Sequence, residues 1–170
     1  EASDFTVWAA EFQTAGRGQR GNTWESAVGE NLTFSILFKP SNFLATRQFE
    51  LSQVVALGVV DYLSTHGIEA KIKWPNDIYV GDRKICGMLI ENSLRGEWLQ
   101  HSIIGIGLNV NQRNFDVTLP NPTSMVLCNE ISGETGSHNV SDSVSHYELH
   151  ELLEEFMDIF RGYLDRYCHI

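Results

Sequence analysis

The segment that most constrains the fold spans residues 71–87, because it predicts three short strands joined by tight turns. Residues 71–74 form the first strand, and the tripeptide Pro-Asn-Asp ends it, since proline lacks an amide donor and Asn and Asp favour turns. A second strand covers residues 78–80, and a Gly-Asp pair predicts a hairpin into a third strand over residues 83–91. This part of the chain therefore folds as adjacent strands with short connections.

Three charged side chains fall at the ends and turns of these strands. Lys73 closes the first strand, Asp77 lies in the turn that follows, and Lys84 lies at the start of the third strand. Because short connections keep the ends of adjacent strands together, we expect two cations and one carboxylate to meet in one place. Such a cluster can bind a polyanion and a metal ion together.

Hydrophobic spacing predicts the remaining helices and strands. The stretch 45–66 carries the wide apolar face of a helix that lies on a sheet. Further strands are predicted over residues 5–12, 32–39 and 98–111, and further helices over residues 125–131 and 147–167. The chain shows no internal repeat, so these elements belong to one continuous arrangement.

The segment 13–26 follows the first predicted strand and is rich in glycine and arginine. Residues 16–21 contain three glycines and two arginines, so backbone amides and guanidinium groups can approach an oxyanion there. The segment lacks both the third glycine of a dinucleotide fingerprint and the Gly-Lys-Ser/Thr of a P-loop. An anion-binding loop and a flexible surface connection fit these residues equally well. Trp24 follows in a polar setting and is suited to stack on an aromatic ligand.

Gly105 and Gly107 lie two residues apart in a strand that is otherwise apolar. Because alternate residues of a strand share a face, this spacing leaves one face without side chains. Another backbone, a flat ligand or a tightly packed helix must come close to that face. The sequence leaves these alternatives open.

Composition restricts the class of protein. The length of 170 residues suits one domain, and the net charge of −10 with a pI near 4.9 argues against nonspecific binding to nucleic acid. A locally basic pocket can still bind a small anion. The chain has no apolar run long enough to span a bilayer, so no membrane partner is expected. Three widely spaced cysteines form neither a disulfide framework nor a CxxC zinc motif, which favours a reducing, cytoplasmic location.

Four short motifs, in this order and at these separations, resemble the catalytic domain of biotin protein ligases. They are Gly16-Arg17-Gly18, Lys73-Trp74-Pro75-Asn76-Asp77, Lys84-Ile85-Cys86-Gly87 and Gly105-Ile106-Gly107-Leu108-Asn109. The match covers nearly the whole chain. The resemblance implies an α+β fold, with a mixed, mainly antiparallel β-sheet and helices packed on it, similar to class II aminoacyl-tRNA synthetases. It also implies that residues 1–170 are a single catalytic domain truncated at both ends, with neither a DNA-binding domain nor a C-terminal β-barrel domain.

The resemblance further implies an ATP-dependent ligase. Such an enzyme activates biotin as biotinyl-5'-AMP, with Mg²⁺, and transfers it to a lysine of a biotin carboxyl carrier protein; a homodimer is also expected. Arg17 and Lys84 then correspond to catalytic residues at the reacting carboxylate and phosphate. Asp77 corresponds to a third, placed to bind the metal ion or to orient the incoming lysine.

The same resemblance assigns further contacts with the ligands. Gln13 would bond the biotin ring system, and the strand glycines would line its slot. The full set is Gln13, Gly16, Arg17, Gly18, Gln19, Arg20, Trp24, Lys73, Asn76, Lys84, Gly87, Gly105, Gly107 and Asn109, with Trp24 and Asn109 on the adenylate side.

Two positions depart from the family's pattern. The position after Gly18 is commonly arginine, whereas here it is Gln19 followed by Arg20, and Thr33 stands where some relatives have tyrosine. Two alternative functions are compatible with the fold. A lipoate ligase or octanoyl transferase would need a longer apolar tunnel, and a noncatalytic module that binds biotin or an adenylate would need no lysine at the reacting carboxylate.

Overall fold

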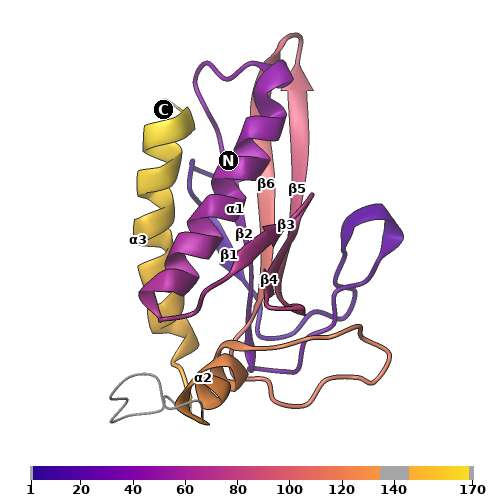
Figure 1. Cartoon of the computed structure of the whole chain (residues 1–170). Coiled ribbons are helices and arrows are strands. Elements are labelled where there is room, and N and C mark those ends of the chain that lie inside the picture. Colours follow the sequence, from indigo (N-terminus) through magenta and orange to yellow (C-terminus); the bar gives the residue numbers. More distant parts are fainter. Residues whose placement is uncertain (1, 135–145, 169–170) are drawn as a thin grey trace.

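The computed structural model describes residues 2–134 and 146–168 of the chain (Figure 1). The strands are short at the two ends of the sheet and long in its middle. The elements in chain order are β1 (Val7–Ala9), η1 (Gln19–Gly21), β2 (Asn31–Phe38), η2 (Ala45–Arg47), α1 (Gln48–Thr65), β3 (Lys71–Lys73), β4 (Asp77–Val80), β5 (Arg83–Arg95), β6 (Trp98–Asn109), α2 (Met125–Glu134) and α3 (Leu149–Cys168).

The six strands form one sheet in the order β1-β2-β6-β5-β4-β3. Neighbouring strands of this sheet pair antiparallel throughout, and the parallel component is an isolated bridge between Lys84 and Pro122. The three strands predicted within residues 71–91 are present, and they occupy one end of the sheet. The predicted α+β fold is therefore confirmed.

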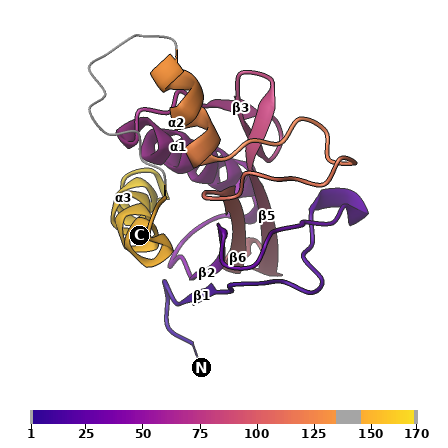
Figure 2. The same ribbon diagram turned by 90° about the horizontal axis from the view of Figure 1, so that it is seen from below.

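The helices α1 and α3 cover one face of this sheet. In Figure 2 the chain is seen from below, with α1 and α3 on one side of the strands and the segment that carries η1 on the other. Ile104, Ile106 and Leu108 of β6 are buried in the same apolar cluster as the two helices. Because neighbours along a strand point to opposite faces, Gly105 and Gly107 lie on the face away from the helices.

Aromatic packing fixes α1 and α3 against the sheet. The ring of Phe156 on α3 meets Phe34 of β2 and Tyr62 of α1 edge-on, each at 5.3 Å between ring centroids. The helices also approach closely at Gly58 of α1, where an added Cβ would lie 3.0 Å from Phe160 of α3. These contacts bury the helix-covered face of the central strands and leave the other face for a ligand site.

Most predicted element positions are confirmed, but two strand boundaries were wrong. β1 covers Val7–Ala9 rather than residues 5–12, because Phe5 has a positive φ of 56° and cannot continue an extended strand. β5 extends four residues beyond the predicted end at Glu91, because it stays paired with β6 as far as the hairpin. In the described ranges, no helix has both the length and the apolar character that crossing a bilayer requires.

The three cysteines are buried thiols, which gives a simple test of the core. Burial raises the pKa of Cys86, Cys128 and Cys168, the last to about 11. Because the thiolate is the reactive form, we expect Ellman's reagent at pH 8 to label them at least ~10-fold more slowly in the native than in the guanidinium-unfolded protein. Rapid labelling of any thiol in the native protein would contradict this burial.

Candidate functional site

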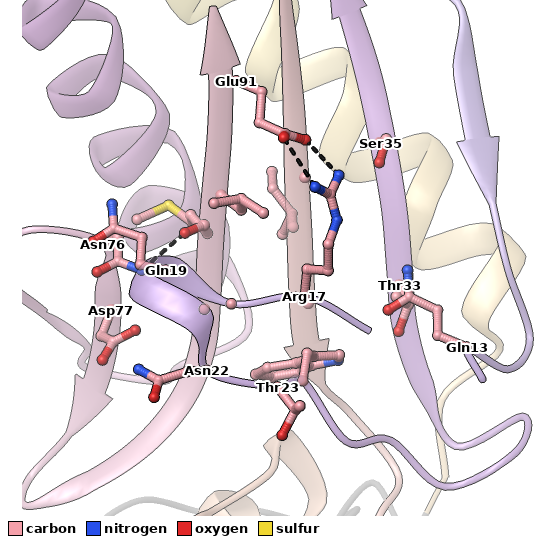
Figure 3. Close-up of a pocket in the computed structure, with 18 of the residues that line it drawn as sticks. Gln13, Arg17, Gln19, Asn22, Thr23, Thr33, Ser35, Asn76, Asp77 and Glu91 are labelled. Carbon is pink, nitrogen blue, oxygen red and sulfur yellow. Dashed lines mark hydrogen bonds and ion pairs between the residues drawn. The ribbon is translucent and has the colours of Figure 1, made fainter. Parts of the chain in front are cut away.

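A cavity of about 330 Å³ lies on the sheet face that the helices leave uncovered (Figure 3). Five parts of the chain form its wall: the glycine-rich segment over residues 13–24, β2, the end of the β3–β4 turn with the first residue of β4 (residues 75–77), β5 and β6. Segments far apart in the sequence therefore meet around one space. The cavity is lined mainly by polar groups, among them the labelled Arg17, Glu91 and Asp77 in Figure 3.

The floor of the cavity is made of small residues from three neighbouring strands. Gly107 of β6 lies between Thr33 of β2 and Gly87 of β5, and Gly105 lies in the next row of the same face, beside Ser35. Residues that are paired across antiparallel strands share a face, so the floor is nearly free of bulky side chains here. This confirms the prediction that one face of the β6 strand is bare.

The indole ring of Trp24 lies directly on this bare surface. A Cβ added at Gly107 would lie 2.4 Å from the Cε2 atom of Trp24, and one added at Gly87 would lie 3.2 Å from its Cζ3 atom. The group that approaches these glycines is thus an aromatic side chain of the chain itself, which sequence reasoning did not consider. Gly16 accepts a hydrogen bond from the Trp24 amide at 3.0 Å, and no room exists for a side chain at Gly16.

Lys84 and Asp77 form the charged end of the cavity. The Nζ atom of Lys84 lies 2.8 Å from Oδ1 of Asp77, and both side chains keep partial access to solvent. Asn76 fixes the end of the turn just before Asp77. Its side-chain amide donates to the Met88 carbonyl and its backbone carbonyl accepts from the Met88 amide, each at 2.9 Å. The Nζ atom also lies 5.9 Å from the centre of the Trp24 ring, so the cation borders the indole.

Arg17 points across the cavity to Glu91 on β5. The guanidinium group donates two hydrogen bonds to the two carboxylate oxygens, at 2.8 and 3.2 Å, and Figure 3 shows both as dashed lines. The side chains are 70% and 48% exposed, so water competes for this pair and its net contribution is small. An anionic ligand in the cavity can therefore take the arginine away from Glu91.

Replacing Glu91 with glutamine tests this competition. Because the resemblance implies ATP as a ligand, we expect Glu91→Gln to bind it two- to fivefold more tightly, since an exposed ion pair worth up to ~1 kcal/mol no longer holds Arg17. Isothermal titration calorimetry in 50 mM and 500 mM NaCl would measure the gain, which should shrink at high salt. Glu97→Gln removes the same charge at the exposed β5–β6 turn and should leave the affinity unchanged. An equal gain in both variants would show a net-charge effect only.

Most of the residues predicted for the site lie around the cavity. Gly16 does not line the cavity, but its carbonyl accepts a hydrogen bond from the amide of Trp24, which does. The side chain of Arg20 lies outside the part of the chain that the structure describes. The predicted residues that line the cavity are Gln13, Arg17, Gly18, Gln19, Trp24, Asn76, Asp77, Lys84, Gly87, Gly105 and Gly107.

Two predicted residues lie elsewhere. Lys73 is exposed and lies over the ring of Tyr79, 4.3 Å from its centre, with its Nζ atom 3.2 Å from the phenol oxygen. Lys73 pairs with Asp77 across β3 and β4, but its side chain turns to Tyr79 and does not line the cavity with Asp77 and Lys84. Asn109 is buried next to Thr123 and does not line the cavity either.

Sequence reasoning missed Glu91, Ser35 and Leu89, which also line the cavity. A signal was present, since Leu89 and Glu91 follow Gly87 at steps of two along β5 and so share its face. For a metal ion, the described residues contain no cluster of three or more Asp, Glu, His or Cys side chains. Any ion at Asp77 would therefore take most of its ligands from a bound substrate or from water.

Comparison with known protein families, curated proteins and solved structures relates the chain to biotin ligases in each case. The sequence pattern of the Biotin/lipoate A/B protein ligase family matches residues 2–109. Among curated proteins, the chain is 33% identical over 167 residues to the biotin--[acetyl-CoA-carboxylase] ligase of Paracoccus denitrificans, a match that covers 95% of this chain and 65% of that protein. It is 36% identical over 116 residues to the bifunctional ligase/repressor BirA of Bacillus spizizenii, covering 68% of this chain and 35% of BirA.

Among solved structures, the fold is similar to the biotin protein ligase of Aquifex aeolicus in complex with biotin and ATP. The TM-score is 0.77 at 30% sequence identity, and the match covers 98% of this chain and 63% of that one. The chain thus spans between about a third and two thirds of the length of these relatives. All the residues that line the cavity fall within the stretch 2–109 that the family pattern matches.

Proposed function

Because the chain belongs to the biotin/lipoate A/B protein ligase family, we propose that it activates biotin with ATP and transfers it to a protein lysine. The observation that carries the proposal is the convergence of Arg17 and Lys84 on one cavity with a glycine floor. The floor suits a flat bicyclic ring, and the two cations suit a carboxylate and a phosphate. The relatives named above are a biotin--[acetyl-CoA-carboxylase] ligase and a ligase crystallised with biotin and ATP.

The first step joins two anions. An oxygen of the biotin carboxylate attacks the α-phosphorus of ATP, the bond from that phosphorus to the β-phosphate oxygen breaks, and pyrophosphate leaves. Lys84 and Arg17 offset the repulsion between carboxylate and phosphate, and they stabilise the charge that develops at phosphorus. To do so, Arg17 must leave the Glu91 carboxylate and bind the ligand instead. This is possible because the Arg17–Glu91 ion pair is exposed and therefore weak.

Asp77 is the proposed metal contact of this site. A Mg²⁺ ion that arrives with ATP takes phosphate and water oxygens as most of its ligands, so one carboxylate fits it as a single further ligand. When bound, the ion would neutralise charge on the phosphates. The proximity of the Lys84 cation, 2.8 Å from Oδ1 of Asp77, makes this ligand weaker than an unpaired carboxylate.

The second step transfers biotin to the acceptor. The neutral amine of a lysine attacks the carbonyl carbon of biotinyl-5'-AMP, AMP leaves, and the amine loses a proton as the amide forms. Asp77 would orient that amine or receive its proton, since it lies at the charged end of the cavity. We propose a biotin carboxyl carrier protein as the acceptor, and residues 1–170 as one catalytic domain.

A pyrophosphate-release assay with alternative acids tests the substrate. We expect ATP to release pyrophosphate with biotin and not with lipoate or octanoate, because the cavity of about 330 Å³ is a short polar slot rather than a long apolar tunnel. The family's description covers lipoate ligases as well, so the comparison of biotin with lipoate decides which acid is the substrate. Turnover with lipoate alone would overturn the choice of biotin. Binding of biotin and ATP without pyrophosphate release would identify a noncatalytic binding module.

The proposal also includes a cytoplasmic location and a homodimer. Three buried thiols are consistent with a reducing compartment. The half-exposed Leu94 and Trp98 on the β5–β6 hairpin provide apolar surface for a second copy. Sedimentation at micromolar concentration would detect a species of twice the 19.2 kDa chain mass, and a monomer at all concentrations would refute the dimer.

A further inference from the structure

The side chain of Lys73 lies opposite a carboxylate but turns away from it. Lys73 pairs with Asp77 across β3 and β4, which places the two Cβ atoms about 5 Å apart on one face of the sheet. Opposite charges in this arrangement normally attract each other. The Nζ atom of Lys73 instead lies 4.3 Å from the centre of the Tyr79 ring and 3.2 Å from the Tyr79 hydroxyl oxygen. Tyr79 is the more distant, diagonal neighbour, because its own partner on β3 is Lys71.

A β-bulge brings a second lysine to the same carboxylate. Along β4 and β5, residues 78 and 86 pair, but the next pair is Tyr79 with Lys84, so Ile85 is an extra residue in β5. Lys84 therefore shares the face of Tyr79, and its Nζ atom lies 2.8 Å from Oδ1 of Asp77. Within the described ranges, the other oxygen of this carboxylate, Oδ2, has no hydrogen bond or ion pair. One oxygen of Asp77 thus contacts a cation, and the other is open.

Two interactions keep Lys73 away from the open oxygen. The Lys84 cation repels a second cation near Asp77, and the ring and hydroxyl of Tyr79 attract Lys73. The repulsion weakens during the proposed reaction, because Lys84 then contacts the reacting carboxylate and phosphate. The Lys73 side chain is exposed and flexible, so its ammonium group can then reach Asp77. At that stage the contact with Tyr79 is what holds Lys73 back.

The open oxygen of Asp77 matters most in the second proposed step. There Asp77 orients the amine of the acceptor lysine or receives its proton, and either role needs an oxygen that the amine can reach. A Lys73 ammonium group on Oδ2 would occupy the place of that amine. It would also make the carboxylate a weaker proton acceptor, because a second positive charge stabilises the ionised form.

We propose that Tyr79 is a positioning residue for biotin transfer, which holds the Lys73 cation away from Asp77 so that the acceptor amine can reach the carboxylate. This deepens the proposed function and rests on it. The role belongs to the second step, because Lys84 still repels Lys73 while it remains on Asp77. Loss of Tyr79 should therefore slow transfer and spare adenylation.

Tyr79→Leu tests the role, since leucine lacks both the ring and the hydroxyl. We expect the rate of transfer from preformed biotinyl-5'-AMP to a biotin carboxyl carrier domain to fall about two- to fivefold, the size of an exposed cation–π contact. Single-turnover mixing would measure this rate. Biotin-dependent pyrophosphate release without acceptor should be unchanged. Tyr79→Phe keeps the ring and should transfer at the wild-type rate. If Tyr79→Leu does not fold, Tyr79→Thr suits a strand and also lacks the ring.

A second substitution separates this role from a loss of packing. In the Tyr79→Leu background, Lys73→Gln removes the competing cation and should restore the wild-type transfer rate, whereas a merely structural role predicts no rescue. The defect of Tyr79→Leu should also shrink in 500 mM NaCl, because salt screens the attraction between Lys73 and Asp77. Tyr167→Leu, at an exposed position of α3, is the control and should leave both steps unchanged. Unchanged transfer in Tyr79→Leu, or a loss that Lys73→Gln does not restore, would overturn the proposal.

NMR separates this proposal from the proposed function. Ring currents shift the signals of protons that lie over an aromatic ring, so the ε-methylene protons of Lys73 should resonate upfield of those of Lys71. In Tyr79→Leu the difference should disappear. This readout needs no substrate. Ordinary Lys73 signals in the wild-type protein would refute the positioning role even if transfer is active. Upfield Lys73 signals in a protein that releases no pyrophosphate with biotin would instead refute the proposed function.

Discussion

Lys84→Ala is expected to lower the rate of biotinyl-5'-AMP formation by about 100- to 1,000-fold. The Nζ atom lies at the charged end of the cavity, 2.8 Å from Asp77, where it can stabilise charge that develops on the carboxylate and the α-phosphate. Loss of one preorganised donor of this kind typically has an effect of that size. Quench-flow measurement of biotinyl-5'-AMP with saturating biotin and ATP would report the step directly.

The fold should survive this substitution. Lys84 and Asp77 are 31% and 25% exposed, so removal of their partly solvated ion pair should cost no more than about 1 kcal/mol of the free energy of unfolding. Lys71→Ala removes an exposed lysine from β3 and serves as the control for net charge. Adenylation by Lys84→Ala at a rate close to that of wild type would remove Lys84 from the mechanism.

Gly107→Ala is expected to displace the Trp24 indole from the glycine floor and to weaken biotin binding. The new Cβ would lie 2.4 Å from Cε2 of Trp24, a distance at which the ring must leave. Overpacking of this kind costs about 1–3 kcal/mol, so biotin affinity should fall by roughly 10- to 100-fold where the methyl group narrows the slot. Titration calorimetry would measure the affinity.

Tryptophan fluorescence would report the movement of the ring independently. The other three tryptophans, Trp8, Trp74 and Trp98, are 47–68% exposed, so displacement of Trp24 should move the emission to longer wavelength. Gly162→Ala is the matched control, because a Cβ there meets no atom within 4 Å and alanine favours the α3 helix. An unchanged emission spectrum and unchanged biotin affinity in Gly107→Ala would show that the floor does not form the slot.

Local sequence patterns were sufficient for the sheet and for the bare floor of the site, whereas the family resemblance supplied most of the other site residues. Alternation and turn residues predicted the hairpins around Asp77 and Lys84, because these are set by contacts between near neighbours in the chain. The spacing of Gly105 and Gly107 predicted the bare face for the same reason, since a period of two fixes which residues share a face. The grouping of Arg17 with Lys84 came from the resemblance, not from spacing.

Long-range register explains what the sequence did not predict. The bulge at Ile85 depends on how β5 pairs with β4, and the regular period of two gives no sign of it. Lys73 was expected in the cavity, and it does pair with Asp77, but its side chain lies on Tyr79, a contact that depends on how β3 pairs with β4. The Arg17–Glu91 pair joins residues 74 positions apart, so no local pattern could indicate it.

A crystal structure of the protein grown with biotin and ATP would test the proposed site in a single experiment. We predict biotinyl-5'-AMP with its ring on the surface formed by Gly105 and Gly107, from which the Trp24 indole has moved, its phosphate within hydrogen-bond distance of Lys84 Nζ, and Arg17 released from Glu91. Ligands bound away from the glycine floor, with Arg17 still paired to Glu91 and Lys84 without a phosphate contact, would contradict it.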